Sequence, residues 1–139
     1  MNGADNVRLL REAFSALARG DNENFLACVS NDVQLEHPLP RELWRYGGKR
    51  HGKPEMAEYL AGLGETYDIE RFEPTEFIAQ RDTVAIVGIQ RYRIKATGRK
   101  VEDDWVMIFT MNDGKASRVR VFFDTAQVVA DLQRNGRGL

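Results

Sequence analysis

The sequence has few of the residues that build disulfides and metal centres. Among its 139 residues are one cysteine, Cys28, and two histidines, His37 and His51. A single cysteine excludes an internal disulfide and a cysteine cluster. The histidines are not at the H-x-x-H or H-E-x-x-H spacing of zinc sites. We therefore expect no metal site.

The sequence also lacks long apolar runs, glycine-rich phosphate loops and an excess of one charge. The N-terminal segment MNGADNVRLL is polar and is typical of neither a signal peptide nor a membrane span. The 20 Lys and Arg residues are balanced by 21 Asp and Glu residues, which gives a net charge of −1. This balance does not favour nucleic acid or an anionic membrane as a partner. We predict a cytoplasmic protein without a nucleotide or other cofactor.

The first half of the chain has the periodicity of helices. One apolar stripe has spacings of three and four, and consists of Val7, Leu10, Phe14 and Leu17. Asp5 is the expected N-cap of this helix and Gly20 its stop, and Asp21 is expected to cap a shorter second helix. Pro54 suits the first turn of a third. The length is that of one domain, which we expect to span residues 1–139.

The second half alternates like antiparallel strands. Strands are expected over 33–37, 69–79, 83–96 and the two arms of 101–125. Asn112-Asp113-Gly114 marks a hairpin between those arms. Residues 41–52 are irregular and predict a loop, and 125–133 predict a short final helix. Helices followed by an antiparallel meander predict an α+β domain, in which helices pack on one side of a strongly curved sheet and enclose a space for a ligand.

The last predicted strand combines charged and apolar positions. Alternation defines two faces, with Arg120, Phe122 and Asp124 on one and Val119, Val121 and Phe123 on the other. A charged pair beside an aromatic is the pattern expected of a polar patch inside an apolar pocket. We therefore expect the first face to line the cavity. The wholly apolar face is expected to point outward and to be buried in a homodimer through the sheet.

Several segments together resemble a known superfamily. The VQLEHPLP segment, the TGRKV turn, the NDGK hairpin and the closing RVFFDTA are similar to nuclear transport factor 2-like proteins, and most of all to the SnoaL-like branch of polyketide cyclases and ketosteroid isomerase-related proteins. The resemblance covers residues 7–132. It implies a cone-shaped fold with N-terminal helices on a curved antiparallel sheet around a cavity. Because this cavity serves isomerases, dehydratases, cyclases, epoxide hydrolases and binding proteins, the fold leaves the reaction open.

The resemblance also implies roles for individual residues. Ketosteroid isomerases carry their general base in an E-D-P sequence, where this chain has Glu36-His37-Pro38, and their oxyanion hole falls at Trp105. Limonene epoxide hydrolases carry Y-F-D where Phe122-Phe123-Asp124 stands, but their central R-x-D pair falls here on Arg91 and Arg93, so its acid is missing. SnoaL-type cyclases, which use a cavity carboxylate and no cofactor, demand the fewest residues that this chain lacks.

Asp124 and His37 are the candidate catalytic residues. A carboxylate in an apolar cavity has a raised pKa, which suits a general acid or base, although Asp124 is also placed to cap the final helix. His37 could act as a base at its ordinary pKa of about 6.5. Alternation cannot decide whether His37 or Glu36 faces the cavity. The candidate substrate-binding residues are Glu36, Trp44, Tyr59, Arg91, Trp105, Arg120 and Phe122.

Two functions fit these observations. The first is a cofactor-independent lyase, isomerase or cyclase that moves a proton next to the carbonyl group of an apolar small molecule. Asp124 or His37 would transfer the proton, and Arg91 or Arg120 with the Trp105 indole would hold the developing negative charge. The alternative is a non-catalytic module of the same fold that binds a hydrophobic ligand or dimerises.

Overall fold

The computed structural model describes residues 2–135 of the protein, and the side chains of residues 2–131. Ten elements follow one another along the chain. They are α1 (Gly3–Ala18), α2 (Asn22–Leu26), β1 (Val29–His37), β2 (Gly48–His51), α3 (Lys53–Thr66), β3 (Tyr67–Gln80), β4 (Thr83–Ile94), β5 (Lys100–Asn112), β6 (Lys115–Phe123) and α4 (Ala126–Asn135).

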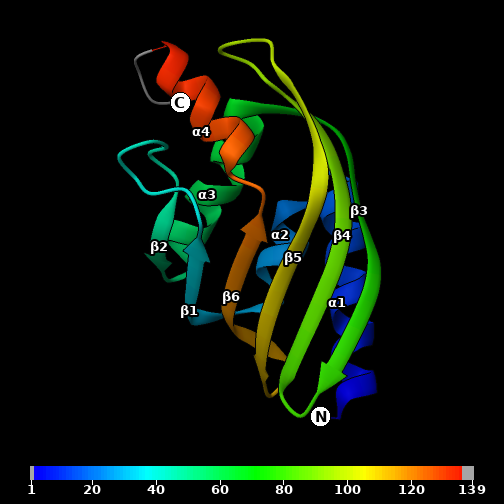
Figure 1. Ribbon diagram of the computed structural model, residues 1–139. Helices are drawn as coiled ribbons and strands as arrows, with labels where there is room; N and C mark the ends of the chain where they lie inside the picture. Colours follow the sequence, from blue (N-terminus) through cyan, green and yellow to red (C-terminus); the bar gives the residue numbers. More distant parts are fainter. Residues whose placement is uncertain (1, 136–139) are drawn as a thin grey trace.

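The six strands form one curved sheet in the order β2-β1-β6-β5-β4-β3. The helices α1 and α2 lie behind this sheet in Figure 1, and α4 follows β6 near the end that carries the β4–β5 turn. The α+β architecture is confirmed. One strand pair departs from the expected antiparallel pattern, because β1 runs parallel to β6, with Leu35 opposite Val119 and Glu36 opposite Arg120. In the sequence, β2, α3, β3, β4 and β5 lie between these two strands, so no local pattern predicts the pairing.

Two local predictions about the first half are wrong. The N-cap of α1 is Asn2, whose side chain accepts from the Asp5 N–H at 2.9 Å, while the Asp5 carboxylate accepts from the Asn2 N–H at 3.3 Å. Asp5 therefore completes a capping box from inside the helix. Residues Gly48–His51, predicted as loop, form the edge strand β2 against β1. A four-residue strand between glycines is too short for alternation to reveal.

Two other local predictions are confirmed. Pro54 stands in the first turn of α3, where its missing N–H costs nothing. The β5–β6 hairpin turns at Asn112-Asp113-Gly114, where Asp113 and Gly114 have φ angles of 49° and 78°. Positive φ at both central residues matches the right-handed twist of the flanking strands.

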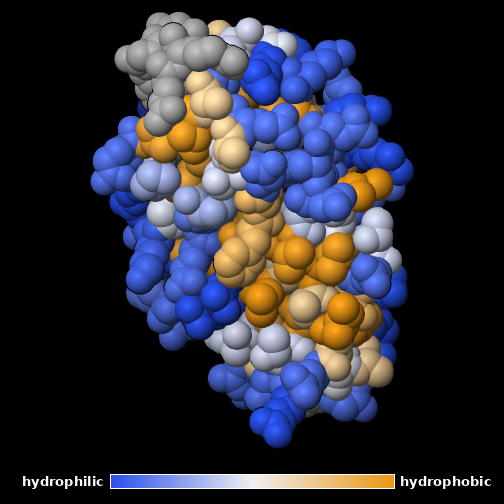
Figure 2. All heavy atoms as spheres, viewed as in Figure 1, coloured by the Kyte–Doolittle hydropathy of each residue, from blue (hydrophilic) through white to orange (hydrophobic). Residues whose placement is uncertain are grey.

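The predicted orientation of β6 is wrong. Val119 and Val121 are 2% and 5% exposed and face the helices, whereas Phe122 is 41% exposed on the outer face. Burying three successive apolar side chains under the helices removes more apolar area from water than burying the face with the charges. On the outer face, Phe122 lies opposite Val106, which lies opposite Val87. Figure 2 shows the resulting apolar area over the middle strands.

Candidate functional site

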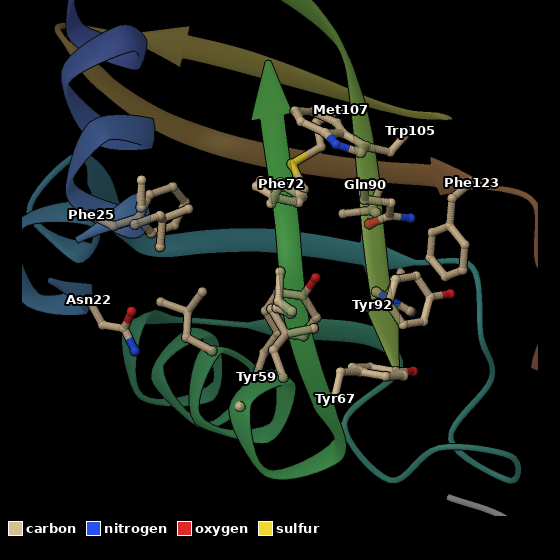
Figure 3. Close-up of a pocket in the computed structure, with 18 of the residues that line it drawn as sticks. Asn22, Phe25, Tyr59, Tyr67, Phe72, Gln90, Tyr92, Trp105, Met107 and Phe123 are labelled. Atoms are coloured by element: carbon tan, nitrogen blue, oxygen red, sulfur yellow. The ribbon is translucent and has the colours of Figure 1, made fainter. Parts of the chain in front are cut away.

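A cavity of about 670 Å³ lies between the inner face of the sheet and the helices. Its walls are largely apolar, and its aromatic and polar side chains come from α2, α3 and the strands (Figure 3). The apolar walls include Leu17, Phe25, Leu35, Met56, Val119 and Val121. A cavity of this size, with a few polar groups on apolar walls, is typical of sites for small organic ligands.

His37 lies at the end of β1 and is enclosed by aromatic rings. Its ring centroid is 4.9 Å from that of Trp44, 5.5 Å from that of Tyr59 and 5.4 Å from that of Phe123. Burial lowers the pKa of His37 to about 3, because the positive imidazolium would be stripped of water. His37 is therefore a neutral imidazole at physiological pH.

A backbone hydrogen bond determines which nitrogen of His37 carries the proton. The Leu39 N–H donates to Nδ1 at 3.2 Å, so Nδ1 is the bare, accepting nitrogen. The proton of the neutral ring is then on Nε2. Nε2 has no hydrogen-bond partner among the described residues, and the ring lines the cavity. His37 thus offers a ligand an N–H donor in apolar surroundings.

Three buried tyrosines add hydroxyl groups to the same cavity. Tyr59 comes from α3, Tyr67 from the start of β3 and Tyr92 from β4, and all three line the cavity (Figure 3). Burial raises the pKa of each phenol, which keeps it protonated. No hydrogen bond joins these hydroxyls to any other described residue. Because buried polar groups are normally hydrogen-bonded, these hydroxyls are available to a ligand or to water.

Gln90 and Asp103 form a polar pair at the β4–β5 side of the cavity. They are directly opposite each other, and Gln90 Nε2 donates to Asp103 Oδ1 at 2.9 Å. Burial raises the pKa of the Asp103 carboxyl group, and the hydrogen bond from Gln90 opposes that rise. Gln90 lines the cavity, with Asp103 behind it.

The sequence analysis did not select Gln90, Tyr67 or Tyr92. Gln90 and Tyr92 have a signal that could have found them, since they continue the inward alternation of Ile86 and Gly88 along β4. Tyr67 has none, because it stands where α3 passes into β3.

Trp105 is a wall of the cavity, and its N–H is already occupied. The indole stacks on Phe72, with ring centroids 4.5 Å apart and planes 4° apart, and on Phe14 at 5.7 Å. Its Nε1–H donates to the Ile89 carbonyl at 3.1 Å. The expected role as a donor to negative charge is therefore not available to Trp105 in this arrangement.

Asp124 lies outside the cavity, at the start of α4. Its Oδ1 accepts a hydrogen bond from the Ala126 N–H at 3.0 Å, which agrees with the capping interpretation. It belongs with Asp103 and Asp104 to a shallow surface depression and is absent from the cavity lining. The inverted orientation of β6 accounts for this placement.

Four other candidates also lie on the outer side of the sheet. Glu36 accepts from Arg118 at 2.8 Å and lies 3.4 Å from Arg120, so the alternation of β1 places His37 inside and Glu36 outside. Arg91 is exposed and pairs with Glu70 at 2.9 Å. Phe122 belongs to the outer apolar area.

The structure thus brings together only part of the predicted set. His37, Tyr59 and Trp105 line the cavity. Trp44 is fully buried behind His37, and its Nε1–H donates to Thr66 Oγ1 at 2.9 Å. Trp44 therefore supports the His37 ring from behind.

Among the described residues, no group of three or more His, Cys, Asp or Glu side chains could hold a metal ion. None of the described helices is long and apolar enough to cross a membrane.

The SnoaL-like domain family matches residues 10–119. The chain belongs to the SnoaL-like family. A search of the curated proteins finds no match. Among solved structures, this SnoaL-like domain is similar to a nuclear transport factor 2-like protein from Burkholderia xenovorans, with 32% identity, 94% of this chain and 97% of that chain covered, and a TM-score of 0.82. These matches confirm the resemblance and the nuclear transport factor 2-like fold.

Two further structures are similar over nearly their whole length. A protein of unknown function from Burkholderia pseudomallei is 26% identical, with 94% of this SnoaL-like chain and 97% of that chain covered and a TM-score of 0.83. TerC, which was co-crystallized with polyporic acid, is 27% identical, with 93% of this chain and 98% of that chain covered and a TM-score of 0.81.

Proposed function

We propose that the protein is a cofactor-independent isomerase, lyase or cyclase that acts on an apolar, carbonyl-bearing small molecule in the cavity. The observation that carries this proposal is the neutral His37, whose Nε2–H has no hydrogen-bond partner among the described residues and lies in apolar, aromatic surroundings. Such a group is suited to donate a hydrogen bond to a carbonyl oxygen.

The proposed chemistry is stabilisation of an enolate. When a proton leaves the carbon next to a carbonyl group, negative charge develops on the carbonyl oxygen. A donor already in place in a water-poor cavity stabilises this charge more strongly in the transition state than in the bound substrate. His37 would make that contact, and the hydroxyls of Tyr59 and Tyr92 line the same space.

The cavity lining limits the substrates that such an enzyme could use. Its two carboxylates, Glu70 and Glu73, are exposed on β3 and are ion-paired with Arg91 at 2.9 Å and Arg71 at 3.1 Å. Neither is a free base. The proposed substrate therefore has an acidic carbon, such as one between two carbonyl groups, whose proton can pass to water at the cavity mouth.

TerC gives the proposal independent support. This relative was co-crystallized with polyporic acid, a small organic compound, and is similar to the present chain over almost the full length of both. A small organic ligand in the cavity of this chain is consistent with that relationship.

A non-catalytic ligand-binding module is the second candidate. The ion pairs of Glu70 and Glu73 favour it, because they leave the lining without an unpaired carboxylate to accept a proton. The apolar walls and the unpartnered hydroxyls would serve binding equally well.

Hydrogen exchange in a 1,3-diketone separates the two candidates. In D₂O, benzoylacetone loses its central C–H signal when the enolate forms and then takes up deuterium from the solvent, and the wild-type protein should accelerate this loss. His37→Phe removes the donor and should lower the catalysed rate by about 10²-fold, the usual effect of losing one such donor. Asp124→Asn is the control and should keep the wild-type rate. Binding without accelerated exchange would establish the second candidate, and absence of binding would contradict both.

A further inference from the structure

The Gln90–Asp103 pair gives the cavity a fixed acceptor. A carboxylate only accepts hydrogen bonds, so the side of the Gln90 amide that faces Asp103 must be its NH₂ group. The amide oxygen, Oε1, is then turned the other way. Figure 3 shows this oxygen on the side of Phe72 and the nitrogen on the opposite side.

No described residue donates to Gln90 Oε1. The amide cannot turn over to exchange oxygen for nitrogen, because the carboxylate would then face a carbonyl oxygen. Asp103 itself has little room to turn, since its Oδ2 is buried. Asp103 therefore holds Gln90 with its acceptor toward the cavity.

The other polar groups of the cavity interior do not duplicate this property. His37 Nε2–H is a donor, and the hydroxyls of Tyr59, Tyr67 and Tyr92 can either donate or accept. Gln90 Oε1 is fixed as an acceptor, and it stands on β4, three strand positions from His37 on β1. Two different strands of the cavity wall thus offer a ligand a hydrogen-bond donor and a fixed acceptor.

We infer that Gln90 is a specificity-determining residue that accepts a hydrogen bond from a hydroxyl group of the ligand, and that Asp103 is the residue that positions it. The ligand class is then a hydroxylated carbonyl compound with an apolar body, with its carbonyl oxygen at His37 and its hydroxyl at Gln90. This inference rests on the proposed function, since it takes the carbonyl contact with His37 as given.

Fluorescent naphthyl ketones provide a direct test. The probes are 2-acetylnaphthalene, which has only the carbonyl group, and its 6-hydroxy and 7-hydroxy derivatives. At least one hydroxy derivative should bind about tenfold more tightly than the parent ketone, because a buried acceptor left without a partner costs on the order of one hydrogen bond. Equal affinities for all three probes would overturn the inference.

Two variants assign the preference to the pair. Gln90→Met keeps the length of the side chain without its acceptor, and should remove the tenfold gain while the affinity for 2-acetylnaphthalene stays within about threefold. Asp103→Asn allows the Gln90 amide to turn over, and should reduce the gain in a protein with unchanged affinity for the parent ketone. A gain that survives Gln90→Met would overturn the subsite, and one that survives Asp103→Asn would overturn the positioning role.

The parent ketone separates this inference from the proposed function. Its affinity should fall in His37→Phe, because the carbonyl contact is lost. If it binds equally well to wild type and His37→Phe, or if no probe binds at all, the proposed function fails and the inference fails with it. If its binding depends on His37 while the hydroxyl group adds nothing, only the inference fails.

Discussion

The backbone N–H of Leu39 donates to Nδ1 of His37, two residues earlier in the chain. Pro38, between them, has no N–H and ends the ladder of β1, so the chain bends at this point. The orientation and tautomer of the imidazole are thereby determined by the end of its own strand. No carboxylate of the described residues is hydrogen-bonded to the ring, and burial among aromatic rings keeps it neutral.

Neutral His37 predicts a loss of stability in mild acid. Its pKa is about 3 in the folded protein and near 6.5 when unfolded, so between these values the unfolded chain binds a proton that the folded one does not. The free energy of unfolding should therefore fall as the pH decreases from 7 to 5, with a slope approaching about 1.4 kcal/mol per pH unit. Urea denaturation at pH 5, 6 and 7 measures this slope. His37→Gln should flatten this dependence, and an unchanged slope in that variant would contradict the burial argument.

Because Asp124 caps α4, we expect its substitution by alanine and by asparagine to differ in their effect on stability. Asp124→Ala removes the acceptor of the Ala126 N–H and should lower the free energy of unfolding by about 1 kcal/mol. Asp124→Asn keeps an acceptor and should be nearly neutral. Both variants should exchange benzoylacetone at the wild-type rate, because Asp124 lies outside the cavity. Loss of exchange in a stable Asp124→Asn protein would return Asp124 to the list of catalytic candidates.

The wall formed by Trp105 depends on the absence of a side chain at position 88. A Cβ atom on Gly88 would lie 2.1 Å from Trp105 Cζ2 and 2.6 Å from the Glu73 carbonyl oxygen. Gly88→Ala should therefore destabilise the protein by about 1–3 kcal/mol, the usual range for overpacking. Gly64→Ala in α3 is the matched control, since its Cβ would meet nothing within 4 Å and alanine favours helix. Urea denaturation followed by circular dichroism measures the free energy of unfolding of both variants. Equal effects of Gly88→Ala and Gly64→Ala would contradict the close contact between Gly88 and Trp105.

We expect the homodimer to form through the outer face of the sheet, because the face that carries Val119 is buried under the helices. Phe122, Val106 and Val87 form an apolar row across three strands, and the Arg120 guanidinium lies 5.1 Å from the Phe122 ring centroid. Light scattering at micromolar concentration should give twice the chain mass of 15.8 kDa. Phe122→Asp should give the monomer mass, whereas Ile69→Ser, an exposed residue at the cavity, should not. A single-chain mass for wild type would refute the homodimer.

Local patterns in the sequence determined much of the fold. The stripe through Leu10 and Phe14, the proline before α3 and the Asn112-Asp113-Gly114 turn each depend on residues a few positions apart. Alternation also separated His37 from Glu36, and Val121 from Phe122, correctly into opposite faces.

Which of those faces points inward was decided only by the tertiary structure. Alternation has the same period whichever face is buried, so it cannot tell a cavity wall from an outer surface. The answer depends on the apolar area that the helices and neighbouring strands can cover together, and for β6 that area favoured Val119 and Val121. Gln90 and Asp103 meet across two strands in the same way. The site therefore arises from contacts between distant segments, which no local pattern specifies.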